Sequence, residues 1–323
     1  MMSTAERPMV VIITGPTAVG KTAASIEIAQ KMRGEIISAD SMQIYRFMDI
    51  GTAKPSEEER KGIPHHIMDQ LDPAERFTVA DFQQTAFQII GKIHQRGNLP
   101  IVTGGTGLYL HSLLYQMNFT DVEIDQQLRA RLEEEAAELG GQAMHQRLET
   151  LDPEAAERIH PHNVKKIIRA LEVRLNAEQG VQDFSKDLVI NADYDFRVFV
   201  FHEDRDSLYN RINRRVDLML EIGLESEVRR LLALGYDEKL PAMQGVGYKE
   251  MIRYIKGEIG YEESVDTIKR NSRRYAKRQL TWFKKLPHAH WLFVDRDKPR
   301  DQEINRLISL ILKNLSGTNP STE

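Results

Sequence analysis

The sequence predicts an α/β fold with a parallel sheet core, an all-helical insertion and a helical C-terminal part. Four apolar runs have the composition of buried parallel strands, and helix-forming segments separate them. These runs are Val10–Thr14, Glu35–Ser38, Leu99–Thr103 and Arg197–Phe201, and Trp291–Val294 is a candidate for one more. Strands that alternate with helices favour a parallel sheet with right-handed crossovers.

The composition limits the kind of protein. The 323 residues are enough for about two domains, and 41% of them are hydrophobic, which is enough for a sizeable core. We find no apolar stretch of membrane-spanning length and no signal peptide, and there is no cysteine to form disulfides or to bind zinc. We therefore expect a cytoplasmic protein. Because the net charge is −4, binding to nucleic acid must rest on local basic patches.

The first predicted strand leads into a phosphate-binding loop of the pattern G-x-x-x-x-G-K-[ST]. Its residues are Gly15, Pro16, Thr17, Ala18, Val19, Gly20, Lys21 and Thr22, and the helix-forming run Ala23–Met32 follows. The backbone N–H groups of such a loop and the start of the next helix bind anions. Lys21 adds a positive charge for the outer phosphates, and the Thr22 hydroxyl suits Mg²⁺. The setting predicts a P-loop NTPase-like core but leaves the bound phosphate compound open.

Two further strand ends carry small or polar residues. Ligands of parallel α/β sheets bind beyond the carboxyl ends of the strands, so Asp40, after the second run, should face the same ligand as the loop. Asp40 could accept a proton, bind Mg²⁺ or cap a helix. The third strand leads into Thr103–Tyr109, whose glycines permit close backbone approach and whose Thr106 offers a hydroxyl.

Helix signals divide the rest of the chain. Thr78 and Asp81 form a predicted capping box for a helix that extends to about Gln95. The segments Ile124–Leu139, Asp152–Glu154 and Asn163–Asn176 read as helices without an intervening strand. We interpret 122–189 as an all-helical insertion into a core made of 1–121 and 190–315. Residues 205–285 are again mostly helical, and the polar residues 316–323 are expected to be disordered.

Three clusters of basic residues are candidates for phosphate contacts. Lys269–Lys285 holds eight Lys or Arg residues and no acid, and its packed face is predicted at Tyr275, Gln279, Trp282 and Leu286. A second cluster, 165–169, lies in the insertion. Two such clusters suit a large polyanion. In the third, Arg211, Arg214 and Arg215 could stabilise a leaving group, or pair with Asp217 and Glu221 on the same helix.

These motifs in this order resemble those of the bacterial tRNA dimethylallyltransferases, also called tRNA isopentenyltransferases, over nearly the whole chain. The segments that carry the resemblance are Gly15–Thr22, Ala39–Tyr45, Gly51–Pro55, Gly104–Tyr109, Gly245–Glu250 and Lys277–Phe283. The eukaryotic relatives add a C-terminal zinc finger, which a chain without cysteine lacks.

The resemblance implies the transfer of a dimethylallyl group from dimethylallyl diphosphate to N6 of adenine 37 in tRNA, beside the anticodon. Lys21, Arg215 and a Mg²⁺ on Thr22 would then neutralise the departing diphosphate, and Asp40 would take the N6 proton. Arg211 is the rival of Arg215 for this role. The implied enzyme is a monomer that binds the tRNA anticodon stem-loop and no membrane.

The resemblance also implies contacts with tRNA along the chain. They fall on Asp40, Ser41, Met42, Gln43, Thr106, Arg129, Lys165, Lys166, Ile167, Ile168, Arg169, Gln244, Gly245, Val246, Gly247, Tyr248, Lys249, Lys277, Arg278, Gln279, Leu280, Thr281, Trp282, Phe283 and Lys284. The basic residues alone had indicated only the stretches at 165–169 and 277–284.

Three other functions fit part of the sequence. An adenylate isopentenyltransferase, which prenylates AMP or ATP, would share the loop and Asp40 but would have no use for the basic clusters. A small-molecule P-loop kinase would use the loop for ATP, with the insertion as a lid. A non-catalytic RNA-binding protein would not need Asp40.

Overall fold

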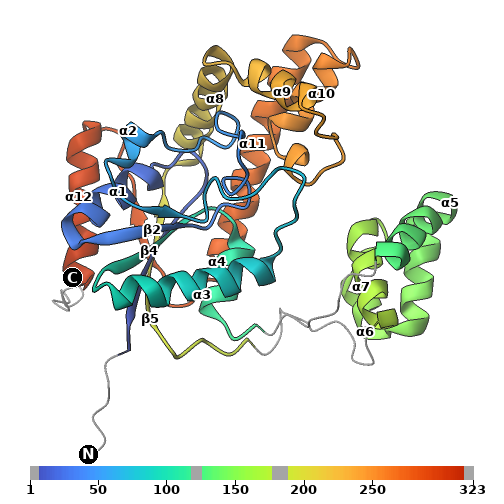
Figure 1. Ribbon diagram of the computed structural model, residues 1–323, viewed down its shortest axis with the longest axis horizontal. Helices are drawn as coiled ribbons and strands as arrows, with labels where there is room; N and C mark the ends of the chain where they lie inside the picture. Colours follow the sequence, from blue (N-terminus) through green and yellow to red (C-terminus); the bar gives the residue numbers. More distant parts are fainter. Residues whose placement is uncertain (1–6, 118–125, 177–187, 316–323) are drawn as a thin grey trace, which may run out of the picture. The chain divides into compact units, whose positions relative to one another are not determined.

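The computed structural model describes residues 7–117, 126–176 and 188–315 (Figure 1). The chain divides into two compact units, one formed by residues 1–116 and 190–323 and the other by residues 117–189. The predicted tail at 316–323 and the first residues of the predicted insertion, 122–125, lie outside the described residues.

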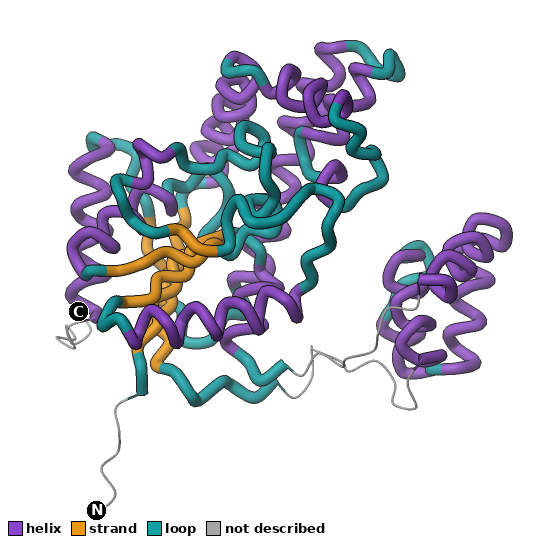
Figure 2. Tube along the Cα trace, viewed as in Figure 1, coloured by secondary structure: helices purple, strands orange, loops and turns teal. Residues whose placement is uncertain are grey.

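The larger unit is built on a six-stranded parallel sheet with the strand order β3-β2-β4-β1-β5-β6 (Figure 2). The strands are β1 (Met9–Thr14), β2 (Gly34–Ser38), β3 (His65–His66), β4 (Leu99–Gly104), β5 (Asp195–His202) and β6 (His290–Phe293). All five predicted strands are confirmed. β3 was not predicted, because its two residues pair with Ile36 and Ile37 of β2 without an apolar run of their own.

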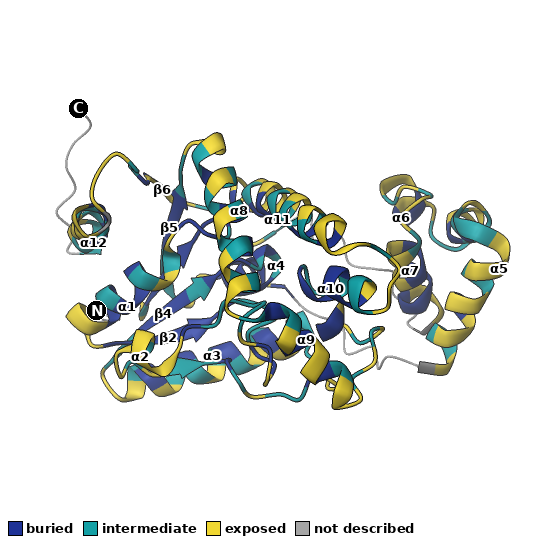
Figure 3. Cartoon of the chain, turned by 90° about the horizontal axis from the view of Figure 1, so that it is seen from above, coloured by how far each residue is buried: buried dark blue, intermediate teal, exposed yellow. Residues whose placement is uncertain are grey.

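Helices cover both faces of this sheet, which is why its strands read as continuous apolar runs. Val11 and Ile13 share a core cluster with α1 (Lys21–Met32) and α12 (Arg300–Leu315). The alternate residues Val10 and Ile12 are just as fully buried, and α3 (Val79–Gln95) and α4 (Gly107–Leu114) lie on the side of the sheet away from α1 (Figure 3).

Local signals fix where several helices begin. Thr78 and Asp81 form the predicted capping box of α3, with the Thr78 side chain accepting from the backbone N–H of Asp81. A second capping box, between Ser56 and Glu59, opens the short helix α2 (Glu57–Arg60). Gly20 stands before α1 with φ 106°, a left-handed conformation that favours glycine.

The C-terminal part of the larger unit is helical, as predicted. It consists of α8 (Arg205–Glu221), α9 (Leu224–Ala233), the 3₁₀ turn η1 (Ala242–Gln244), α10 (Tyr248–Ile255) and α11 (Tyr261–Phe283). The predicted packed face of α11 needs a correction of one position. Phe283 is fully buried, whereas Trp282 is 40% exposed, although its ring lies edge-to-face with that of His111 and the side chain packs closely against Gly107 of α4.

The smaller unit has its own helical core. It consists of α5 (Gln126–Leu151), α6 (Pro153–Arg158) and α7 (Val164–Asn176). The first of these runs past the predicted end at Leu139 and breaks at Gly140, where the backbone is not helical. Asp152 caps α6 as predicted, accepting from the backbone N–H of Ala155.

The chain leaves and re-enters the larger unit at paired positions. Tyr115 and Ile190 form an antiparallel bridge, and the backbone N–H of Asn191 donates to the carbonyl of Leu114 at 2.9 Å. No helix in the described part of the chain is long and apolar enough to span a bilayer.

Candidate functional site

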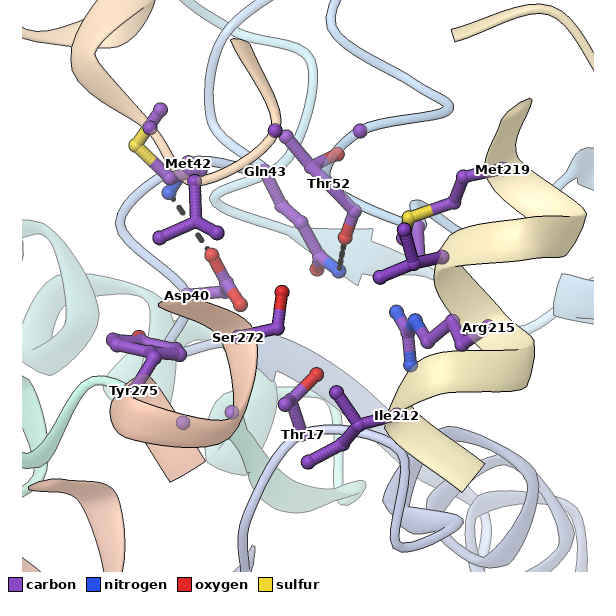
Figure 4. A pocket seen from close by; sticks show the side chains of 18 of the residues that line it. Thr17, Asp40, Met42, Gln43, Thr52, Ile212, Arg215, Met219, Ser272 and Tyr275 are labelled. Atoms are coloured by element: carbon purple, nitrogen blue, oxygen red, sulfur yellow. Dashed lines mark hydrogen bonds between the residues drawn. The ribbon is translucent and has the colours of Figure 1, made fainter. Parts of the chain in front are cut away.

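A cavity of about 170 Å³ lies beyond the carboxyl ends of β1, β2 and β4, where α8 and α11 meet them (Figure 4). It is lined by Thr17, Lys21, Thr22, Asp40, Met42, Gln43, Gly51, Thr52, Ala53, Thr103, Gly104, Gly105, Ile212, Arg215, Val216, Met219, Gly245, Val246, Gly247, Tyr248, Ile268, Ser272, Tyr275 and Gln279. The three strand ends singled out from the sequence therefore do meet at one place.

The phosphate loop is held in shape by its own lysine and by an arginine. Lys21 Nζ donates to the carbonyls of Gly15 and Pro16 at 2.9 and 3.0 Å. The Arg211 guanidinium donates to the carbonyl of Ala18 at 3.0 and 3.1 Å. Burial, and next the positive charge of Arg215, lower the pKa of Lys21 to about 7, against the opposing effect of Asp40. An anion bound here would relieve this repulsion between cations.

Arg215, rather than Arg211, lines the cavity. It stands opposite Asp40, and both polar ends point into the space between them (Figure 4). Burial lowers the pKa of Arg215, while Asp40 raises it. Among the described residues, none forms a hydrogen bond or an ion pair with the Arg215 guanidinium. The alternative of pairing with Asp217 is wrong, because Asp217 pairs with Lys269 of α11 at 2.5 Å.

Asp40 is not a helix cap, since turns rather than a helix follow it. Its Oδ1 accepts from the backbone N–H of Met42 at 3.0 Å, which leaves the rest of the carboxylate to the cavity. Thr106 supports this turn from the neighbouring strand end, because its hydroxyl accepts from the backbone N–H of Ser41 at 3.0 Å. Asp40 is thus fixed within its own turn, and Thr106 ties that turn to the end of β4.

Gln279 ties α11 to two of the loops. Its Oε1 accepts from the backbone N–H of Thr17 at 2.9 Å, and its Nε2 donates to the carbonyl of Gly105 at 3.0 Å. The approach is so close that a Cβ on Gly105 would lie 2.1 Å from that Nε2. A side chain at position 105 would therefore displace the Gln279 amide from these two hydrogen bonds.

A second cavity, of about 1170 Å³, opens on the other side of the phosphate loop. It shares Lys21, Thr22, Ala53, Arg215 and Met219 with the first. Cationic side chains also line it, from Arg46, Lys54, Arg60, Arg211 and Arg214. A diphosphate bound by Lys21 and Arg215 would therefore lie at the junction of the two cavities.

Apart from residues 40–43 and Thr106 at the strand ends, the residues predicted to contact tRNA fall into three groups. On α11, Lys277, Arg278, Thr281 and Lys284 are exposed, Trp282 and Leu280 are partly so, and Phe283 and Gln279 are buried. Around η1, Gln244 is exposed, Gly245, Val246 and Lys249 are half-buried, and Gly247 and Tyr248 are buried. In the smaller unit, Lys165, Lys166 and Arg169 are exposed.

Two of the residues predicted to contact tRNA in the smaller unit have buried side chains. Ile167 and Ile168 are 0% and 5% exposed and pack the helices in the hydrophobic core of that unit. Arg129 and Arg169 both pair with the buried Glu172, at 3.7 and 3.1 Å. On α7, residues 165, 166 and 169 are exposed, whereas residues 167 and 168 are buried. The prediction treated 165–169 as one basic cluster and did not separate these two faces of the helix.

Several residues of the cavity were missed. Ile212, Val216 and Met219 share one face of α8 with Arg215, at the spacing i, i+4 and i+7 from Ile212. That spacing is visible in the sequence and could have found them. Ser272 and Tyr275 line the cavity from α11, and Glu227 supports its wall from α9. Nothing in the sequence distinguishes Glu227 from the other acids of α9.

Oxygen donors for a metal are present but few. Among the described residues, no three His, Cys, Asp or Glu side chains gather to hold an ion. The Thr22 hydroxyl and the Asp40 carboxylate line the cavity. This set fits Mg²⁺, which typically takes one or two protein ligands and completes its shell with phosphate oxygens and water.

Comparison with known proteins gives consistent matches over most of the chain. The IPP transferase family model matches residues 43–286. The tRNA dimethylallyltransferase of Alkaliphilus oremlandii is 55% identical over 87% of this chain and 90% of its own length. That of Acetivibrio thermocellus is 48% identical over 92% of this chain and 96% of its own length.

Solved structures give the same result for the fold. The tRNA isopentenylpyrophosphate transferase of Bacillus halodurans is 44% identical, with a TM-score of 0.71 over 97% of this chain and 98% of its own. A eukaryotic dimethylallyltransferase acting on tRNA is 28% identical, with a TM-score of 0.83 over 98% of this chain and 81% of its own. The parallel α/β core is the P-loop NTPase-like fold of these proteins.

Proposed function

The chain belongs to the IPP transferase family, and on that premise we propose that it transfers a dimethylallyl group from dimethylallyl diphosphate to N6 of adenine 37 in tRNA. The observation that carries the proposal is the placement of Asp40 across one cavity from Lys21, Thr22 and Arg215. A proton acceptor and an anion site that face each other are what this substitution needs.

The reaction forms a bond between N6 and C1 of the dimethylallyl group and breaks the bond between C1 and the diphosphate oxygen. The electron pair of that bond leaves with the diphosphate, where Lys21 and Arg215 offset the growing negative charge. The N6 proton passes to the Asp40 carboxylate. An exocyclic amine is a weak nucleophile, so much of the rate should come from holding both substrates in one cavity.

We assign Mg²⁺ to the Thr22 hydroxyl and the diphosphate. When bound, it would neutralise diphosphate charge and help it depart. The protein's own side chains act alongside it, because Lys21 and Arg215 bind the donor and Asp40 takes the proton.

The acceptor is assigned to the exposed basic side chains. Lys277, Arg278 and Lys284 form a positive face on α11, in the same unit as the cavity. Lys165 and Lys166 form a second one on α7, and we assign residues 122–189 as a tRNA-binding domain. The adenine must leave its stack to enter the cavity, which costs a few kcal/mol. Because tRNA is the acceptor, we place the enzyme in the cytoplasm.

The test is a transfer assay with labelled dimethylallyl diphosphate, Mg²⁺ and either unmodified tRNA or AMP. Label in tRNA that disappears with Asp40→Ala is the expected result. Label in AMP alone would make the protein an adenylate isopentenyltransferase. ATP turnover without label in either acceptor would indicate a kinase. RNA binding without any turnover would indicate a non-catalytic RNA-binding protein.

A further inference from the structure

Glu227 of α9 is a buried carboxylate outside the residues to which the reaction is assigned. It is 4% exposed, and no Lys, Arg or His pairs with it among the described residues. Its Oε2 accepts from the backbone N–H groups of Asp49 and Ile50 at 2.9 and 2.8 Å, and its Oε1 accepts from that of Gly51 at 3.1 Å. Three successive N–H groups that converge on one anion form a strong, directional binding site.

The same carboxylate also holds a tyrosine of the cavity wall. The Tyr248 hydroxyl donates to Glu227 Oε1 at 2.6 Å. Burial, and next the negative charge of Glu227, raise the pKa of Tyr248, so its hydroxyl stays a donor. The ring packs against Gly51 so closely that a Cβ there would lie 2.5 Å from it. Glu227 thus joins the loop at 49–51 to the segment that begins α10.

This loop forms one side of the cavity and orients a polar group inside it. Gly51 and Thr52 line the cavity, and the Thr52 carbonyl accepts from Gln43 Nε2 at 3.3 Å (Figure 4). Gln43 Oε1 in turn accepts from the Ser38 hydroxyl at 3.0 Å. The Gln43 amide, three residues beyond Asp40, is therefore held at both its oxygen and its nitrogen and lines the cavity.

The donor side of the cavity is held by other contacts. Lys21 donates to the carbonyls of Gly15 and Pro16. The Thr17 N–H donates to Gln279. The Ala18 carbonyl accepts from Arg211. None of these contacts involves Glu227. The outer side of the loop at 49–54 has a separate anchor as well, because Lys54 Nζ donates to the carbonyl of Tyr45 and to Asp49, both at 2.8 Å.

We propose that Glu227 is a positioning residue for the acceptor, which holds Gly51, Thr52, Gln43 and Tyr248 as the wall against which the adenine is placed. The inference rests on the proposed function and adds a residue to it. A buried carboxylate without a partner cation is costly unless hydrogen bonds satisfy it. The four donors on Glu227 meet that condition, and two of them, the Gly51 N–H and the Tyr248 hydroxyl, belong to residues of this wall.

The test compares Glu227→Gln with Glu225→Gln. Glu225 lies on the same helix, is partly exposed and pairs with Arg229 at 2.8 Å, away from the cavity. The amide of Glu227→Gln must turn an NH₂ group toward donors, so hydrogen bonds to the loop are lost. We expect kcat/KM for tRNA to fall by about tenfold or more, while the Kd for dimethylallyl diphosphate changes less than about twofold. Glu225→Gln should leave both unchanged.

Tyr248→Phe gives a second, milder test if Glu227→Gln does not fold. It removes only the hydroxyl bond to Glu227, so it should lower kcat/KM for tRNA in the same direction and to a smaller extent. A loss of donor affinity as large as the loss for tRNA would overturn the proposal, as would equal behaviour of the Glu227 and Glu225 variants. Absence of transfer by the unaltered protein would instead overturn the proposed function.

Discussion

The side-chain oxygen of Gln279 accepts a hydrogen bond from the backbone N–H of Thr17 at 2.9 Å. A residue of the basic helix thereby holds the phosphate loop, although 262 positions separate the two in sequence. The surface assigned to tRNA and the site assigned to the donor are therefore joined by one side chain.

Replacing Gln279 with Leu should weaken donor binding. The change leaves the Thr17 N–H and the Gly105 carbonyl without a partner, at a cost of about 1–3 kcal/mol each when buried. We expect a weaker Kd for dimethylallyl diphosphate, measured by calorimetry, and a lower melting temperature. Lys277→Ala, on the exposed face of the same helix, is the contrasting variant. It should weaken tRNA binding and spare the donor; an unaltered donor Kd in Gln279→Leu would contradict this account.

Asp40→Asn should remove the chemistry and keep the binding. The amide oxygen can still accept from the Met42 N–H, but it cannot take a proton. Single-turnover transfer to tRNA should slow by about 10²–10⁴-fold, while the Kd values for both substrates stay within a few fold. Transfer at an undiminished rate would show that another group accepts the proton.

Replacing Arg215 or Arg211 should change different kinetic constants. Arg215 points into the cavity, so Arg215→Ala should lower kcat by about 10²–10³-fold, as expected for a group that stabilises a leaving group. Arg211 supports the carbonyl of Ala18, so Arg211→Ala should mainly raise KM for the donor. Steady-state kinetics of both variants decide the matter, and the reverse pattern would exchange their roles.

Donor affinity should depend on pH through Lys21. Its pKa is about 7 in the free protein, and a bound diphosphate favours the charged form, so the pKa rises on binding. Binding should therefore take up a proton above pH 7, and the Kd for the donor should weaken as pH rises from 7 to 9, by at most about tenfold per unit. Calorimetry in buffers of different ionisation enthalpy measures the uptake. Lys21→Met should bind weakly and without this pH dependence.

In the smaller unit, substitutions of exposed lysines should affect tRNA binding, whereas substitution of a buried residue should affect stability. Lys165 and Lys166 are exposed, so replacing both with Ala should weaken tRNA binding and reduce the slope of log K against log salt by about 1.5. Ile167→Ala should instead lower the stability of the smaller unit by about 2–5 kcal/mol, because Ile167 is fully buried. Binding as a function of salt, together with thermal unfolding, distinguishes them. A salt slope unchanged by the double substitution would remove this surface from the tRNA site.

What could be predicted from sequence depended on whether the signal was local. Five of the six strands, the capping box at Thr78 and the start of α6 at Asp152 are set by neighbouring residues, and they were predicted correctly. On the predicted buried face of α11, Gln279 and Leu286 are buried as expected. Only Trp282 was wrong, because Trp282 and Phe283 are both apolar and the tertiary packing chooses between them. Glu227 could not be found, because its partners at 49–51 are more than 170 positions away and an acid in an acidic helix gives no sign of them.

The pairing of Tyr115 with Ile190 has a consequence for how such an enzyme can change over evolutionary time. The chain leaves the core at Tyr115 and returns at Ile190, and these two residues pair with each other. The segment between them is therefore inserted at a single place in the core. A gene segment encoding it can be lengthened, trimmed or exchanged without disturbing the strands on either side. The basic surface at Lys165 and Lys166 can therefore change while the strands that carry the phosphate loop and Asp40 stay the same.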